Sequence, residues 1–173
     1  MTGRLVALLA AAMLAGCAAD RISGVPPPRQ DAPTRFTKAG CAFTVETVDD
    51  LRGDDSLGAL GLRPVSGEGF MRWFKQQLME LPGYGGAPPR TVLRVDVLKA
   101  YVQGLSTLKS ANIVVRVRYV SAAKPEPTVK VYRGVEGTVN WANSESEAQA
   151  ALQGAWADLR RQLAADLAAS CRA

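Results

Sequence analysis

ANIVVRVRYV, residues 111–120, alternates apolar and polar side chains along its length. One set of alternate positions is apolar: Ile113, Val115, Val117 and Tyr119. The other set is Asn112, Val114, Arg116 and Arg118, which is polar or charged at every position except Val114. Because successive side chains of a strand point to opposite faces, this pattern predicts a strand with one buried and one wet face. Such a strand is typical of an antiparallel sheet that is covered on one side.

Three further segments show the same period of two: residues 41–49, 91–101 and 128–141. In the second, Leu93, Val95 and Val97 are expected on one face, with Arg94 and Asp96 on the other. In the third, the expected apolar positions are Val129, Val131, Val135, Val139 and Trp141. Residues 50–64 are polar and carry three glycines, so we expect a loop there.

Two segments have the spacing of helices instead. Between residues 67 and 81, apolar side chains recur at steps of three and four: Phe70, Trp73, Phe74, Leu78 and Leu81. Ser66 is the expected N-cap of this helix. Ser144 and Glu147 form a capping box before a second, longer apolar stripe. The aromatic stripe could also hold an acyl chain or a glycan, but packing on the sheet is the favoured interpretation.

The predicted fold is therefore α+β: an antiparallel four-stranded sheet covered on one face by two helices, in the order β-α-β-β-β-α. Residues 41–173 are expected to form this single domain. Residues 17–40 contain Pro26, Pro27 and Pro28 and few large apolar side chains, which predicts an extended tether that does not pack.

Residues 1–16 form a signal segment. A single early positive charge, Arg4, precedes an apolar run from Leu5 to Leu14 that is too short to span a bilayer as a helix. Leu14-Ala15-Gly16-Cys17 then resembles the lipobox of bacterial lipoproteins at every position. The resemblance implies cleavage before Cys17, diacylglycerol on its sulfur and an acyl chain such as palmitate on its amine. An ordinary secretion signal with a chance cysteine is the alternative.

The residue after Cys17 is Ala18 and not the aspartate that resembles an inner-membrane retention signal. The resemblance therefore implies anchoring in the outer membrane, on its periplasmic face. With Cys17 acylated, Cys41 and Cys171 remain, and two thiols in an oxidising periplasm tend to pair. We expect a disulfide between them.

Histidine is absent from all 173 residues. Its absence excludes Ser-His-Asp and Cys-His catalytic pairs and histidine-bound zinc. Carboxylate chemistry or a Ser-Lys pair stays open, but the expectation is a protein that is not an enzyme and has no catalytic residue, cofactor or metal site. The net charge of +5 favours anionic surfaces, yet the basic residues are scattered singly, which argues against nucleic acid as a partner.

Arg94, Arg116 and Arg118 are expected to share the wet face of the sheet, with Lys130 and Arg133 beside them. There they could bind phosphate or carboxylate groups. The alternative is solvated charge, balanced by Asp96 and Glu136.

The order of elements and the lipobox together resemble a group of small Gram-negative envelope lipoproteins. The group includes YajG-type lipoproteins, the auxiliary lipoproteins of ABC-type lipid transporters, and the lipopolysaccharide-assembly lipoprotein. The YajG-like similarity covers most of residues 43–167 and rests on residues 45–52, the Leu57-Gly58 step, VYRG at 131–134 and the acidic, serine-rich start of the last helix. The proline-rich tether and the cysteine pair depart from the group.

This resemblance implies a non-enzymatic outer-membrane lipoprotein. It would reach the membrane through its lipid anchor and bind another envelope protein, a lipid or peptidoglycan. The alternative that it implies is an accessory lipoprotein subunit of a lipid or lipopolysaccharide transport system.

Overall fold

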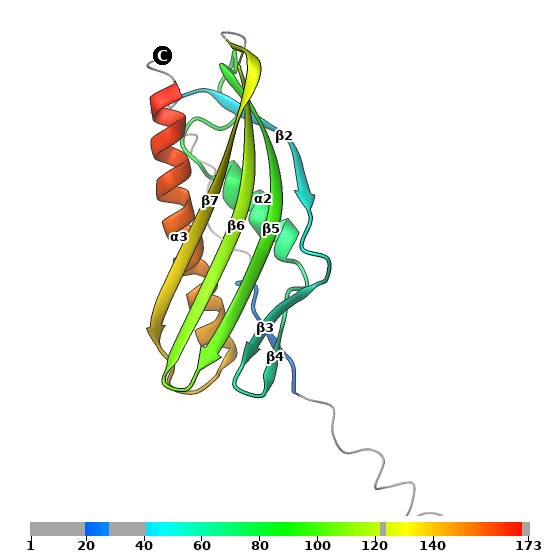
Figure 1. Cartoon of the computed structure of the whole chain (residues 1–173), viewed down its shortest axis with the longest axis vertical. Coiled ribbons are helices and arrows are strands. Elements are labelled where there is room, and N and C mark those ends of the chain that lie inside the picture. Colours follow the sequence, from blue (N-terminus) through cyan, green and yellow to red (C-terminus); the bar gives the residue numbers. More distant parts are fainter. Residues whose placement is uncertain (1–19, 28–40, 122–123, 171–173) are drawn as a thin grey trace, which may run out of the picture.

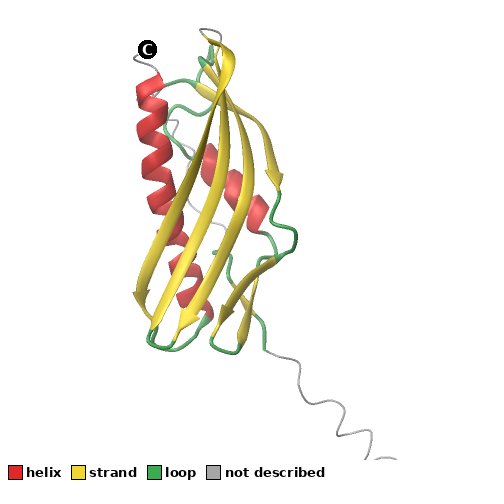
Figure 2. Cartoon of the chain, viewed as in Figure 1, coloured by secondary structure: helices red, strands yellow, loops and turns green. Residues whose placement is uncertain are grey.

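The computed structural model describes residues 20–27, 41–121 and 124–170. In chain order the elements are β1 (Ile22–Ser23), β2 (Phe43–Asp50), β3 (Ser56–Leu60), β4 (Arg63–Ser66), α2 (Phe70–Met79), β5 (Thr91–Leu105), β6 (Leu108–Ser121), β7 (Lys124–Val139) and α3 (Glu145–Ser170). All the strands belong to one sheet, and both helices lie against the same face of it (Figures 1 and 2). The α+β class and the two covering helices are as expected.

The three long strands β5, β6 and β7 form an antiparallel meander, which is the centre of the fold. The side chains of Ile113, Val115 and Val117 are completely buried, as the alternation of residues 111–120 predicts. Their neighbours on β5, among them Leu93 and Val97, face the same core.

The sheet is mixed and seven-stranded, so the prediction of a purely antiparallel four-stranded sheet is wrong. β2 runs parallel to the first half of β5, from Phe43 beside Thr91 to Asp50 beside Val97. The helix α2 lies between these two strands in the sequence, and such a crossover carries the chain back so that both strands run in one direction.

The segment expected to be a loop, residues 50–64, contains β3 and the first half of β4, which together form a hairpin. Gly58 of β3 has a φ of 88°, and a Cβ on this residue would lie 2.6 Å from the carbonyl oxygen of Val102. Glycine therefore lets β3 lie directly against β5, where the two strands pair in parallel. The sequence SLGAL has no alternation, which is why its pattern does not predict a strand.

Part of the segment expected to be a tether also belongs to the sheet. Ile22 and Ser23 form β1, which pairs in parallel with β4, and the side chain of Ile22 is buried. The expectation of an unpacked tether therefore does not hold for residues 20–27, although residues 28–40 lie outside the described part of the chain. The described helices include none with both the length and the hydropathy to cross a membrane.

The apolar face of β7 points the opposite way from the prediction. The expected core residues Val129, Val131, Val135, Val139 and Trp141 are exposed. Tyr132 and Gly134 face α3 instead, and both are buried. An added Cβ at Gly134 would overlap the carbonyl oxygen of Ala155 and lie 2.7 Å from the Cβ of Leu159. The close approach of α3 thus selects a glycine, and not a valine, on the inner side of β7.

We expect Gly134→Ala to lower the free energy of unfolding by about 2 to 3 kcal/mol. The obstructing atoms belong largely to the helix backbone, so a change of rotamer cannot relieve the overlap. Gly137→Ala is the matched control on the same strand, because a Cβ there meets nothing within 4 Å. Urea denaturation of both variants measures the difference, and equal midpoints would show that α3 does not approach β7 so closely.

The two helices meet through aromatic rings. Trp156 of α3 lies edge-on against Phe74 and Trp73 of α2, with ring centroids 5.5 and 6.3 Å apart. The aromatic stripe of α2 therefore packs in the core. The helix itself begins later than predicted: its N-cap is Gly69, with a φ of 79°, and the Ser66 hydroxyl accepts the amide of Glu68 instead.

The predicted capping box at the start of α3 is confirmed. The Ser144 hydroxyl accepts the Glu147 amide, and the Glu147 carboxylate accepts the amides of Ser144, Trp141 and Ala142. Lys109, buried at the start of β6, donates to the same carboxylate at 3.1 Å. These bonds, led by the one from the Trp141 amide, lower the pKa of Glu147 to about 2.

This pKa predicts a stability change with pH. The usual pKa of 4.5 is higher than the folded value of about 2, so the stabilisation is full above pH 4.5 and is lost as the pH falls towards 2. The variant Glu147→Gln cannot ionise there. We expect the difference in unfolding free energy between wild type and variant to shrink from pH 6 to pH 2, as followed by urea denaturation. A difference that stays constant with pH would contradict the bonding pattern.

Candidate functional site: the open face of the sheet

The face of the sheet opposite the two helices is not covered by any described helix (Figure 2). Arg94, Arg116 and Arg118 share this open face, as predicted. The register places Arg94 beside Arg118, and Asp96 beside Arg116. Lys130 does not belong to this group, because it lies on the helix side and pairs with Asp166 of α3 at 2.9 Å.

Each of the three predicted arginines is bound to a carboxylate. Arg116 and Arg118 both donate to Asp96, at 2.7 and 2.9 Å, and Asp96 is only 2% exposed. Arg94 pairs with Glu46 of β2 at 2.8 Å, and this hydrogen bond lowers the pKa of Glu46. Asp96 is thus the counter-charge that the sequence suggests, whereas Glu136 lies on the other side of the sheet, against Gly154 of α3.

Positive charge is nevertheless in surplus towards β7. The exposed Arg133 donates to the amide oxygen of Asn112, at 2.8 and 2.6 Å, and not to a carboxylate. The Nε of Arg118 is buried without a hydrogen-bond partner. The exposed guanidinium of Arg133 can bind a phosphate or carboxylate group, whereas the buried Nε of Arg118 is not accessible to one.

Exposed valines lie directly beside these arginines. In the register of β6 and β7, Val131 is next to Arg116 and Val129 is next to Arg118. Val131 is 62% exposed. The open face is therefore amphipathic, with an apolar ribbon along β7 next to a cationic strip. The ribbon is not predicted from the sequence, because the alternation of residues 128–141 suggests that these valines face the core.

We expect Asp96→Asn to lower the free energy of unfolding by about 1 to 2 kcal/mol, because two guanidinium groups lose the charge that they share. The arginines are partly solvated, which limits the loss. Glu46→Gln, at the exposed pair with Arg94, is the control and should cost clearly less. Thermal unfolding of the two variants provides the comparison. Equal losses would show that Asp96 does not organise the face.

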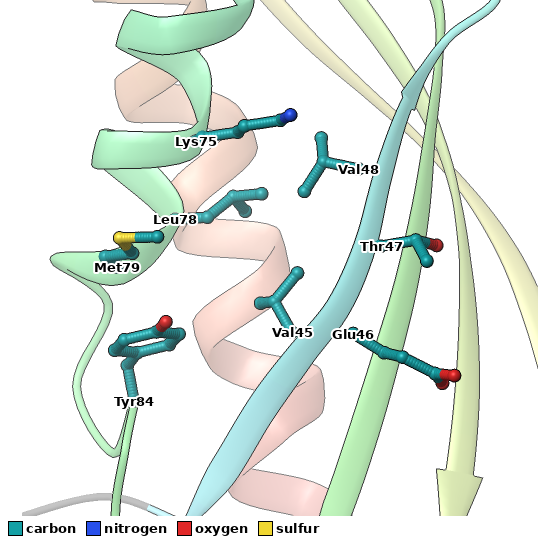
Figure 3. Close-up of a pocket in the computed structure, with 8 residues that line it drawn as sticks. All are labelled: Val45, Glu46, Thr47, Val48, Lys75, Leu78, Met79 and Tyr84. Carbon is teal, nitrogen blue, oxygen red and sulfur yellow. The ribbon is translucent and has the colours of Figure 1, made fainter.

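A small hollow lies at the other edge of the sheet, between β2 and α2 (Figure 3). Val45 and Val48 of β2 point towards Leu78 of the helix, whereas Glu46 points away. The hollow measures about 170 Å³. Sites for drug-sized ligands start at about 300 Å³, so only a small apolar group would fit here.

Polar groups buried on the helix side hold α3 in place. The hydroxyls of Tyr119 and Tyr132 are 2.5 Å apart, and Tyr132 donates to Asp166. Burial raises the pKa of Tyr119 to about 12 and, together with the bond to Asp166, raises the pKa of Tyr132. Both phenols are thus neutral near pH 7, which fits a structural role. The described residues contain no cluster of three or more acidic or cysteine side chains that could hold a metal ion.

Of the three cysteines, the structure describes Cys41. Cys17 and Cys171 lie outside the described residues, so acylation and the disulfide remain predictions. Cys41 is buried, and the hydroxyl of Ser170, the residue before Cys171, lies 3.8 Å from its sulfur. The end of α3 therefore reaches the start of β2, as the predicted pairing requires.

No protein-family model and no curated protein matches this sequence. A Xanthomonas campestris protein described by the family model DUF330 has a TM-score of 0.56 at 10% identity, over 88% of this chain and 97% of that one. A candidate lipoprotein from Caulobacter crescentus has a TM-score of 0.42 at 16% identity, over 74% and 90%. A lipoprotein from Neisseria meningitidis has a TM-score of 0.32 at 14% identity, over 72% and 98%. The first similarity shows the fold, and no function of this chain follows from any of them.

Proposed function

We propose that this chain is a lipid-anchored lipoprotein of the outer membrane, facing the periplasm, that binds an envelope partner without catalysing a reaction. The observation that carries the proposal is the lipobox ending at Cys17, five residues before Ile22, whose side chain is buried in the domain. Two or three acyl chains would hold the protein on a membrane almost permanently, at about 0.8 kcal/mol for each buried methylene.

The open face is the proposed binding surface. It combines exposed valines with Arg133. The guanidinium of Arg133 donates to the amide oxygen of Asn112 and is not bound to a carboxylate. A partner with an acidic, partly apolar surface fits this combination. The absence of histidine supports the non-enzymatic assignment.

Crosslinking in intact envelopes, followed by purification of the acylated protein, tests this proposal. The double variant Val131→Ser/Arg133→Gln should lose the main crosslinked product. The control Arg160→Gln/Arg161→Gln removes two exposed charges from α3 and should keep it. If both double variants still give the main crosslinked product, the binding surface lies elsewhere.

A second candidate is an accessory subunit of a lipid or lipopolysaccharide transport system. The valine ribbon beside the arginines favours it, because acyl chains and phosphate groups need these two kinds of surface side by side. A single transport complex as the main crosslinked product would support this candidate over the first.

A further inference from the structure

One end of the molecule carries an exposed apolar rim. It consists of Leu62, Leu105, Leu108 and Trp141, which are 99%, 53%, 54% and 84% exposed. Leu62 and Trp141 lie in the β3–β4 and β7–α3 connections, and Leu105 and Leu108 are the strand residues on either side of the β5–β6 connection. The connections and the strand ends beside them, residues 60–62, 105–108 and 139–143, include no charged side chain. Such a set of bare apolar tips is unusual for a surface that meets only water.

The three connections are fastened to one another at this end of the sheet (Figure 1). The Asn140 amide donates to the carbonyl oxygen of Thr107 at 2.8 Å. Arg63, the residue after Leu62, donates to the carbonyl oxygen of Asn143 at 3.2 Å. The rim is therefore one surface and not a set of independent loops.

The proposed lipid anchor emerges at the same end. Arg63 also pairs with Asp20 at 2.5 Å, and the Ser23 amide donates to Glu145 at the start of α3. Asp20 is three residues after Cys17. An extended chain spans at most about 3.6 Å per residue, so the Cα of Cys17 lies within about 11 Å of that of Asp20.

We propose that the rim rests in the surface of the phospholipid bilayer, so that the domain stands end-on upon the membrane. This inference depends on the proposed anchoring through Cys17. A tether of three residues leaves no room for the domain to stand away from the bilayer. The indole of Trp141 suits the headgroup level, and the three leucines suit the acyl boundary.

The charges beside the rim fit such a contact. Arg63 is paired with Asp20, and Lys109, next to Leu108, is buried against Glu147. Both cations therefore keep their carboxylate partners when the rim enters the membrane interface. The long strands then point away from the membrane, which leaves the open face accessible from the periplasm.

Fluorescence quenching tests the contact directly. The acylated full chain is reconstituted into vesicles of phosphatidylethanolamine and phosphatidylglycerol, with or without bromine on the acyl chains. Trp73 and Trp156 are only 7% and 4% exposed, so Trp141 is the tryptophan that lipid can reach. We expect brominated lipid to quench the tryptophan fluorescence of the wild type. Most of this quenching should be lost in the Trp141→Phe variant.

Two further variants sharpen the test. Leu62→Ser/Leu108→Ser should weaken the quenching of Trp141, whereas Val129→Ser/Val131→Ser, on β7 away from the rim, should not. Intact mass and flotation of the same sample report on the anchor. An acylated protein that floats with the vesicles but shows no quenching of Trp141 overturns the membrane seat alone. A protein that has no acyl chain and does not float overturns both the anchor and the seat.

Discussion

Replacing Trp156 by alanine is expected to lower the free energy of unfolding by about 3 to 5 kcal/mol, which is a large part of the stability of a domain of this size. Trp156 is the ring through which α3 meets α2, with Phe74 and Trp73 packed edge-on against it. Its removal leaves a cavity between two helices and the sheet, and these elements cannot close together without disturbing the meander.

Trp141→Ala is the matched control, because the same side chain is lost from a position that is 84% exposed. Its effect in solution should stay within about 0.5 kcal/mol. Chemical denaturation, followed by circular dichroism, compares the two variants. Similar losses at both positions would contradict the helix packing that we describe.

Loss of the predicted disulfide between Cys41 and Cys171 should have an effect of similar size. The bridge would close a loop of about 130 residues and would contribute roughly 4 to 5 kcal/mol in the chain-entropy model. The bond from Ser170 to the sulfur of Cys41 places the end of α3 where this pairing needs it.

Single and double variants separate a bridge from two unrelated thiols. Cys41→Ser and Cys171→Ser should each cost about the same, and the double variant should cost no more than either. Electrophoresis with and without reductant gives an independent readout. Additive losses, together with unchanged mobility, would reject the pairing.

Local sequence patterns predict those parts of the fold whose structure depends on interactions within a single segment. The alternation of residues 111–120 predicts β6, and Ser144 with Glu147 marks the first turn of α3. Long-range partners decide the rest. The alternation around Val131 does not say on which side of the sheet the valines of β7 lie. The close approach of α3 at Gly134 decides which face of β7 is buried. Ile22 joins the sheet because β4 offers it an edge.

The candidate site follows the same division. The grouping of Arg94, Arg116 and Arg118 follows from strand periodicity, but the burial of Asp96 between two of them requires the register of β5 and β6. The rim could not be read from the sequence, because Leu62, Leu108 and Trp141 are far apart in it. They meet only when three separate turns come to the same end of the sheet.

Cys17 is expected to become the acylated first residue of a protein seated on a membrane. The intact mass of the chain extracted from membranes tests this expectation. We expect a mature chain that begins at Cys17 and carries diacylglycerol and a further acyl chain, and a Cys17→Ala variant that is not processed there. A membrane-extracted chain that begins elsewhere, or whose Cys17 is unmodified, would contradict it.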